Sequence, residues 1–371
     1  MEPAVESDLA AALASGALVL PADESREPAR VDERLLGSAS REALEARPGL
    51  PHGARVVLRV VEDEEGPRCV FLERLSGNTC AVHSQLGSER QAAACRLFPR
   101  VALRTPLGVS LTLSHYCPSA ADLLFDTTES LRVVEHPPAF PDGVDYEGLD
   151  AQRSVGPLLR PGVLLGWDGL RLWEEHVVSI LAEEGPPEIA LERVRELAEL
   201  LRLWTPASGE FLPFCAGILR GSRGEGSGAD RSGGETPLST GIALELWRWV
   251  AAAVPDPVLR PEEPWAKEDG VHAASLVEAA WTTFARPVRL WLAGRAFASW
   301  LLVQGDGLRT FARSMSAALG VLRAEAGRGC LTAGRPLDRP LLREAIRRAD
   351  LLLVHLVDPE RLARNFSRVE R

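Results

Sequence analysis

Four cysteines in the first third of the chain have the residue type and the spacing expected of a metal site. Only six of the 371 residues are cysteine, and four of them are Cys69, Cys80, Cys95 and Cys117, separated by 10, 14 and 21 residues. Thiolates are strong ligands of zinc and iron, and four of them complete a tetrahedral zinc site or hold an iron–sulfur cluster. The pattern therefore predicts one metal site with these four ligands.

The neighbouring histidine, His83, has three interpretations. It can replace one of the cysteines as a ligand, donate a hydrogen bond to a thiolate, or be a partly buried structural histidine. For the four cysteines, the alternative to a metal site is four ordinary core residues. Cys215 and Cys330 lie alone in the sequence, and each is expected to be a buried free thiol.

The composition is that of a globular protein. Hydrophobic residues make up 46% and charged residues 25% of the chain, and the formal net charge is −10. This charge argues against nucleic acid or an anionic membrane as the main partner. No apolar run is long enough to span a bilayer, and acidic residues near Met1 replace the positive region of a signal peptide. We therefore expect a cytoplasmic protein, in which reduced thiols favour metal binding over disulfides.

The elements expected around the cysteines are short. Residues 54–61 and Cys69–Leu72 predict two strands, Gly108–Ser114 predicts a third, and 88–98 has helix-forming character. Such a domain has few large apolar side chains, so ligation of a metal is expected to supply part of its folding energy.

The whole chain is expected to be α+β and to divide into two domains. Residues 1–135 comprise an N-terminal segment and a small cysteine-rich domain of strands and loops, with its core at 54–119. Residues 136–150 contain several prolines and predict a linker. Residues 151–371 predict a mainly α-helical domain that includes a flexible glycine–serine loop at 220–241.

The helical prediction rests on apolar residues at helical spacing. Two stripes stand out: Leu170, Trp173, Val177, Ile180 and Leu181, and then Ile189, Val194, Leu197 and Leu201. Further helices are expected at 241–253, 272–284, 287–303, 308–326 and 339–356, the last with Asp338 as its cap and Pro340 in its first turn. Core positions are expected for Trp173, Trp247, Trp281, Trp291 and Trp300.

One part of the glycine–serine loop has the glycine pattern of a nucleotide or S-adenosylmethionine loop. It reads Gly224-Glu-Gly-Ser-Gly228. Cofactor loops of this kind need a buried strand immediately before them and a helix immediately after. The flanking residues here are polar or glycine, so the linker interpretation is favoured.

The sequences around the cysteines also resemble a known family. Cys69-Val-Phe-Leu, Cys80-Ala-Val-His, Cys95-Arg-Leu-Phe-Pro and Cys117-Pro resemble the YkgJ-type cysteine-cluster family, over residues 54–119. That family is described as zinc- or iron-chelating and includes the flagellin lysine N-methylase FliB. The resemblance implies that the four cysteines are metal ligands, and it implies S-adenosylmethionine-dependent methylation of protein lysines as an alternative activity.

Three functions follow as hypotheses. The first is a metal-binding protein, with zinc or iron, whose helical domain engages a protein partner. The second is a FliB-like methyltransferase that uses S-adenosylmethionine on a protein substrate. The third is an iron–sulfur redox or sensor protein, which would be coloured, whereas a zinc protein is colourless. No arrangement of nucleophile, histidine and acid stands out, so the sequence indicates no catalytic residues.

Overall fold

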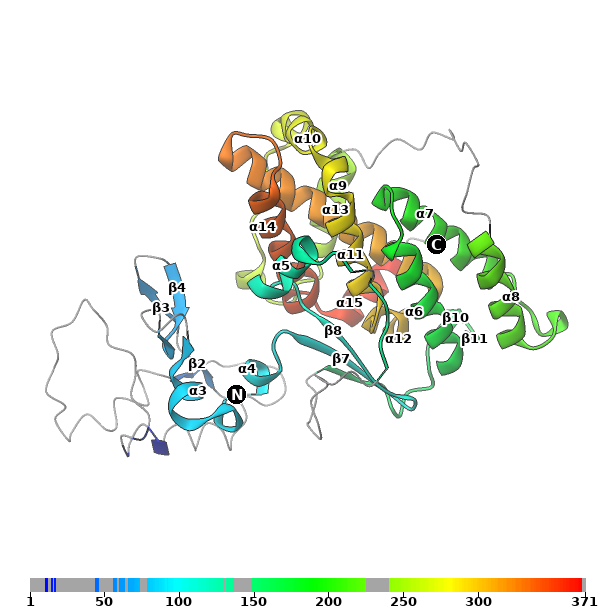
Figure 1. Ribbon diagram of the computed structural model, residues 1–371, viewed down its shortest axis with the longest axis horizontal. Coiled ribbons are helices and arrows are strands. Elements are labelled where there is room, and N and C mark those ends of the chain that lie inside the picture. The colour runs from blue at the N-terminus through cyan, green and yellow to red at the C-terminus, as the bar shows by residue number, and fades with distance from the viewer. Residues whose placement is uncertain are drawn as a thin grey trace, which may run out of the picture. The chain divides into compact units, whose positions relative to one another are not determined.

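The computed structural model contains two compact units, Met1–Phe98 and Pro99–Arg371 (Figure 1). The structure describes residues 11–12, 15, 17, 44–46, 56–58, 60–63, 66–73, 79–91, 93–129, 131–135, 148–224 and 240–368. The division into units falls between the third and fourth predicted ligands, so Cys117 belongs to the second unit. It also precedes the domain end that the sequence predicted at residue 135.

Short antiparallel strand pairs and short helices form the described part of the first unit. The pairs are β1 (Leu44–Ala46) with β2 (Val56–Leu58), β3 (Val60–Asp63) with β4 (Gly66–Cys69), and β5 (Leu72–Glu73) with β6 (Thr79–Cys80). After them come α3 (Ala81–Leu86), a 3₁₀ turn (Ser88–Arg90) and α4 (Ala93–Leu97). Among the residues of this unit whose burial the structure describes, the buried apolar ones are Val70, Phe71, Ala81, Val82 and Leu97.

The predicted elements of this unit are divided in the structure. The strand expected at 54–61 is two strands, β2 and β3. The strand expected at Cys69–Leu72 is the end of β4, a turn at Val70 and Phe71, and the start of β5. Both residues of the turn, Val70 and Phe71, are buried. The helix expected at 88–98 is a 3₁₀ turn followed by α4.

A three-stranded sheet begins the second unit. The strand β7 (Arg100–Thr105) pairs with β8 (Gly108–Leu113) in an antiparallel hairpin, and β9 (Gly148–Asp150) lies parallel to β7 on its other side. The sequence predicted β8 but not β7. Residues 148–150 of the predicted linker are therefore strand, whereas 136–147 lie outside the described residues. A small antiparallel pair, β10 (Leu158–Arg160) with β11 (Val163–Leu164), follows before the chain becomes helical.

Helices make up the rest of the second unit (Figure 1). They are α5 (Pro118–Asp126), α6 (Trp167–Ala182), α7 (Pro187–Arg202), α8 (Phe211–Gly224), α9 (Thr240–Ala251), α10 (Gly270–Glu278), α11 (Ala285–Ala296), α12 (Trp300–Gln304), α13 (Leu308–Ala333), α14 (Arg339–Asp350), a π-helical turn (Leu351–Leu356) and α15 (Pro359–Arg368). The long helix α13 packs against α7, α9, α10 and α14. Gly320 and Gly327 of α13 allow this close packing, since a Cβ atom at either position would lie 2.6 Å from Leu246 or Trp265, respectively. The α+β class is confirmed, with helix predominating.

The predicted helical segments are largely helical, but three of them are divided. The segment 272–284 is α10 and a 3₁₀ turn (Trp281–Phe284), 287–303 is α11 and α12, and 339–356 is α14 and the π-helical turn. One stripe also contains an error. All five stripe residues of α6 are buried, as are Val194, Leu197 and Leu201 of α7. Ile189 is 60% exposed, because the buried face of α7 runs through Ala190, Leu191 and Val194 instead. The cap of α14 is confirmed, since the Asp338 carboxylate accepts a hydrogen bond from the Leu341 N–H at 3.0 Å.

The predicted loop at 220–241 overlaps two helices. The helix α8 continues to Gly224, and α9 begins at Thr240, so both ends of the expected loop are helical. Residues 225–239 lie outside the described part of the chain. Among the described helices, none is both long enough and apolar enough to cross a membrane.

The tryptophan prediction is confirmed for four of the five residues. The exposed fraction is at most 3% for Trp173, Trp247, Trp281 and Trp291. Trp300 is only half-buried, and its Nε1 donates to the Ala102 carbonyl of β7 at 2.9 Å. Three of the buried indoles donate to carboxylates: Trp247 to Glu325 at 2.7 Å, Trp281 to Glu188 at 3.0 Å and Trp291 to Asp350 at 2.9 Å. Carboxylates therefore satisfy three of the four buried indoles, whereas Trp173 Nε1 has no hydrogen-bond partner among the described residues.

Candidate functional site

The strand pairing of the first unit brings the segments of Cys69 and Cys80 together. Cys69 ends β4, and Leu72, three residues later, is the register partner of Cys80 across β5 and β6. The Ala81 N–H also donates to the Phe71 carbonyl at 2.8 Å. Both cysteines are half-buried. Two of the predicted ligands thus lie on neighbouring, hydrogen-bonded segments.

The side chain of Glu73 connects α3 to this strand pair. Its carboxylate accepts from Thr79 Oγ1 at 3.4 Å and from Gln85 Nε2 at 3.3 Å. The short helix begins directly after Cys80, which is its N-cap residue, and its exposed middle carries His83. The interpretation of His83 as a partly buried structural residue is therefore wrong, because the side chain is exposed.

Cys95 lies on α4 and is exposed. Its neighbour Arg96 donates from a guanidinium nitrogen to the Glu89 carbonyl at 3.1 Å, which connects α4 to the preceding 3₁₀ turn. Among the described residues, no three side chains of histidine, cysteine, aspartate or glutamate lie close enough together to hold a metal ion.

The fourth predicted ligand, Cys117, occupies the N-cap position of α5 in the second unit. It is half-buried, and Pro118 is the first residue of the helix. Two ion pairs attach this helix to α14: Asp122 with Arg343, and Asp126 with Arg339, each at 2.6 Å.

The turn that leads to Cys117 is fixed by residues from the C-terminal part of the chain. The buried hydroxyl of Ser114 lies 2.8 Å from His355 Nε2 in the π-helical turn, and Arg347 of α14 donates to the Tyr116 carbonyl at 3.1 Å. The Arg347 guanidinium also lies over the Tyr116 ring, 5.6 Å from its centroid. Although a serine next to a histidine can act as a nucleophile and its base, Ser114 is only 1% exposed, so this pair is structural.

The centre of this arrangement is Asp350, the last residue of α14, which is 1% exposed. Its carboxylate accepts from the His115 backbone N–H at 2.5 Å, from Trp291 Nε1 at 2.9 Å and from an Arg295 guanidinium nitrogen at 3.1 Å. The His115 ring nitrogen Nδ1 lies 3.4 Å from the same carboxylate. One buried carboxylate thus joins the turn before Cys117 to α11 and α14.

The surroundings of Asp350 keep it ionised. Burial by itself raises the pKa of this carboxyl, but the His115 side chain, the Arg295 charge and the His115 backbone N–H outweigh burial and lower the pKa to about 2. The pKa of the nearby His355 is also lowered, but here the shift favours the neutral form. Its main cause is desolvation, because burial disfavours the imidazolium ion.

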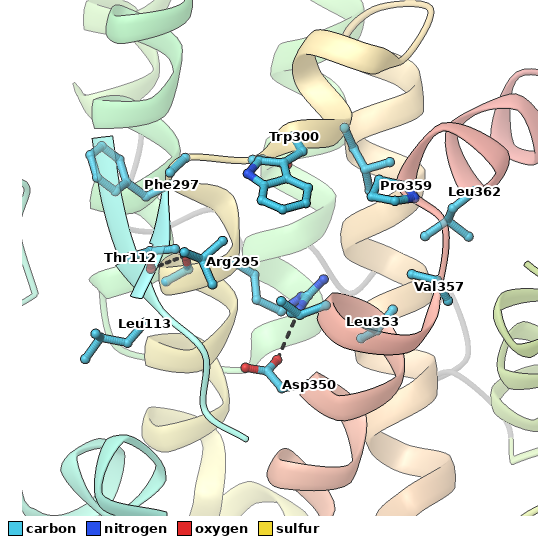
Figure 2. Close-up of a pocket in the computed structure, with 16 residues that line it drawn as sticks. Thr112, Leu113, Arg295, Phe297, Trp300, Asp350, Leu353, Val357, Pro359 and Leu362 are labelled. Carbon is cyan, nitrogen blue, oxygen red and sulfur yellow. Dashed lines mark hydrogen bonds and ion pairs between the residues drawn. The ribbon is translucent and has the colours of Figure 1, made fainter. Parts of the chain in front are cut away.

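A small cavity of about 80 Å³ lies beside this centre, between the β7–β8 hairpin and the C-terminal helices. Figure 2 shows Phe297 and Trp300 at one end of it and the Arg295–Asp350 ion pair at the other, with Leu353 and Val357 along one side. Thr112 Oγ1 donates to the Gly294 carbonyl at 2.7 Å and attaches β8 to α11. The cavity is about half the volume of one that holds benzene, so it fits only water or a very small molecule.

A second buried acid, Glu174 of α6, supports one wall of this cavity. Its carboxylate accepts from the Ala298 backbone N–H at 2.9 Å. Ala298 has φ of 55°, and among the described residues it alone combines a side chain with positive φ. Burial raises the pKa of Glu174 to about 8, so the carboxyl is mostly protonated at neutral pH.

The sequence singled out neither Asp350 nor Glu174. Asp350 falls inside a predicted apolar helix, where a single aspartate also fits a solvent-facing position. The sequence contains one weak sign that Asp350 is buried, because this aspartate interrupts the apolar run Ala349–Leu353. The helix changes from α to π geometry directly after it. Glu174 stands beside Glu175, and spacing alone does not decide which of the two faces the core.

The cysteines outside the predicted site differ from those within it. Cys215 and Cys330 are buried free thiols, as predicted, and desolvation raises the pKa of each to about 11. Such thiols are inert, because the reactive and metal-binding form is the thiolate. Cys69, Cys80, Cys95 and Cys117 are all half-buried or exposed.

No family model, curated protein or solved structure matches the chain.

Proposed function

We propose that this protein binds a transition-metal ion, zinc or iron, through the thiolates of Cys69, Cys80 and Cys95. Cys117, or His83 on its exposed helix, is the candidate fourth donor. Thiolate-rich donor sets suit zinc, iron and iron–sulfur clusters alike, so the proposal includes all three. That the helical unit engages a protein partner remains a prediction from the sequence.

The observation that carries this proposal is the contrast between two classes of cysteine. The four cysteines in one stretch of sequence lie at or near the ends of short elements and are accessible, whereas the two isolated cysteines are in the helical core. If the four were ordinary core residues, they would be buried like Cys215 and Cys330. The pairing of β5 with β6 supports the proposal further, because it brings the segments of Cys69 and Cys80 together.

Because no three donor side chains within the described residues are assembled into a cage, the ion would have to gather its ligands. Metal binding and folding are coupled in this way in small domains with thin cores. The first unit fits this condition in the size of its elements, since those described are at most six residues long.

The test is metal analysis and an absorption spectrum of protein purified without oxygen. We expect about one zinc ion per chain without colour, or iron with a visible absorption band. Cys95→Ser should lose most of the metal and lose hydrogen-exchange protection in residues 54–98, while the helices beyond residue 150 keep theirs.

Single substitutions decide the ligand set. Cys69→Ser and Cys80→Ser should release metal as Cys95→Ser does, and comparison of Cys117→Ser with His83→Ala identifies the fourth donor. Cys215→Ala is the matched control, because it removes a thiol from the helical core and should leave the metal content unchanged. Wild-type protein that contains neither metal nor cluster after anaerobic purification and reconstitution would refute the proposal.

The methyltransferase alternative has a separate readout. Titration with S-adenosylmethionine, followed by calorimetry, would detect the cofactor whether or not a metal is bound. Saturable binding would favour the alternative; no observation among the described residues favours it now.

A further inference from the structure

A second, larger cavity lies in the helical unit. Its volume is about 690 Å³, and it is lined by residues of α7, α9, α13 and α15. Pockets for small organic ligands typically measure about 300–1,000 Å³, and about 150 Å³ is enough for one benzene ring. The cavity therefore has room for an organic molecule of two rings or more.

Two aromatic side chains form a corner in this cavity. Trp249 of α9 and Phe366 of α15 meet edge to face, with ring centroids 4.6 Å apart and planes inclined by 71°. Leu246 of α9 and Ala312 of α13 continue the apolar wall. A flat ring that packs on one of the two aromatic planes meets the other at its edge, and both contacts are favoured between aromatic rings. The corner therefore favours a planar aromatic ligand.

The arginines that line the cavity are engaged with partners in the protein. Arg309 holds Glu199 through two hydrogen bonds, at 2.6 and 2.7 Å. Arg195 donates two hydrogen bonds to Glu192, one turn earlier on α7. An Arg313 nitrogen donates to a main-chain carbonyl of α15 at 2.9 Å. These side chains give the cavity a fixed wall, and an acidic ligand would have to compete with contacts that already exist.

Glu245 of α9 lines the cavity without such contacts. Among the described residues its carboxylate accepts no hydrogen bond, and it interacts only with the charge of the exposed Arg248. It lies four residues before Trp249, and side chains at this spacing are neighbours on one face of a helix, with Cβ atoms about 5–6 Å apart. A donor group on a ring that packs against Trp249 is therefore within reach of this carboxylate. Together with Glu192 and Glu199, Glu245 balances the charge of the three arginines, so the cavity has no net charge that would attract an ion.

We propose that this cavity binds a neutral aromatic molecule that carries a hydroxyl or N–H donor. The ring lies in the corner formed by Trp249 and Phe366, and the donor bonds to the Glu245 carboxylate. A ring without a donor would leave that hydrogen bond unmade, an anion would meet Glu245 as a like charge, and a cation would meet the arginines. This site is independent of the proposed metal site, because its lining residues all belong to the second unit.

Three probes with the same ring system test the proposal. Naphthol has a hydroxyl donor, methoxynaphthalene has none, and naphthoate is an anion. Calorimetry with the full-length protein, supported by tryptophan fluorescence, should show saturable one-to-one binding of naphthol. Naphthol should bind about fivefold more tightly than methoxynaphthalene, because only its hydroxyl donates to a carboxylate. Naphthoate should bind more weakly than naphthol.

Variants locate the binding. Glu245→Ala should weaken naphthol binding about fivefold and leave methoxynaphthalene binding nearly unchanged. Glu360→Ala is the matched control: Glu360 is an acid of α15, another helix of the cavity, but it forms an exposed ion pair with Arg364 instead of lining the cavity. Its substitution should leave the affinity for naphthol unchanged. Trp249→Leu should weaken the binding of both neutral probes, because it removes one plane of the corner.

Four outcomes would overturn the proposal. They are no saturable binding of naphthol up to its solubility limit, equal affinities for naphthol and methoxynaphthalene, tighter binding of naphthoate than of naphthol, and unchanged naphthol affinity in Glu245→Ala. Glu245→Ala remains decisive if Trp249→Leu loosens the helices, because Glu245 is exposed and alanine favours the helix. The unfolding midpoint of each variant shows whether it is folded.

Discussion

Asp350→Asn should destabilise the second unit by about 3–5 kcal/mol, the range seen when one partner of a buried ion pair is removed. The substitution keeps the shape of the side chain but removes its charge. Arg295, whose side chain is only 14% exposed, then keeps a buried positive charge without its carboxylate partner. The hydrogen bonds from Trp291 and the His115 backbone N–H also weaken, because a neutral amide oxygen is a poorer acceptor than a carboxylate. Urea unfolding monitored by tryptophan fluorescence measures the loss.

The matched control is Asp126→Asn, which removes an aspartate from an exposed ion pair with Arg339. Its side chain is 56% exposed, so the expected change in unfolding free energy is below about 1 kcal/mol. Equal effects of the two substitutions would show that Asp350 does not organise the buried centre. Combining Asp350→Asn with Arg295→Met should recover part of the loss, because the uncompensated charge is then gone.

The same carboxylate gives the protein an acid-dependent stability. The folded-state pKa of Asp350, about 2, is below its ordinary value of 3.8, so its ionisation stabilises the folded state above about pH 4. This contribution, about 2 kcal/mol, is lost as the pH falls from about 4 to 2. Asp350→Asn should therefore flatten this part of the stability profile, and a profile as steep as that of the wild-type protein would contradict the assignment.

Glu174→Gln should make the protein more stable than the wild type at pH 8, with the advantage shrinking toward acidic pH. Burial raises the folded-state pKa of Glu174 from 4.5 to about 8, so folding favours the protonated acid. The contribution of Glu174 to wild-type stability should therefore be most favourable below about pH 4.5, become less favourable as the pH rises to about 8, and then level off. The penalty reaches about 3 kcal/mol at pH 7, and glutamine does not incur it because its amide does not ionise.

Glutamine at position 174 still provides an oxygen for the Ala298 N–H, so the wall of the small cavity should keep its geometry. Unfolding free energies measured between pH 5 and 9 test the prediction. Glu175→Gln is the control, since Glu175 is the exposed neighbour and its substitution should leave most of the pH dependence in place. A wild-type profile without a decline between pH 5 and 8 would show that Glu174 is ionised in the folded protein.

The helical elements followed from local sequence patterns. The stripe of α6 and the Asp338 cap of α14 were predicted correctly, because helical periodicity and capping depend on residues within a few positions of one another. The error at Ile189 has the same origin. Ile189 lies in the first turn of α7 and is apolar, so local spacing places it in the apolar stripe. Which face of α7 is buried depends on the helices that pack against it.

The strands were harder to predict, because a strand is completed only by its partner. The segment 54–61 has the composition of one strand, but its two halves pair with different segments, β1 and β4. The sequence around the edge strand β9 predicts a linker, because local patterns do not reveal its partner β7, which precedes it by more than 40 residues.

The helical content of residues 151–371, the core positions of four of the nine tryptophans and the division of the six cysteines into a clustered set and two buried ones follow from the sequence alone. These properties depend on composition and local spacing. Which acids are buried is visible only in the folded chain. Asp350 and Glu174 resemble the many surface carboxylates of the chain, and their burial depends on Arg295, His115 and Ala298, which are 55 or more residues away. A buried carboxylate is stable only where donors from distant segments meet it, and that meeting is a property of the packed fold.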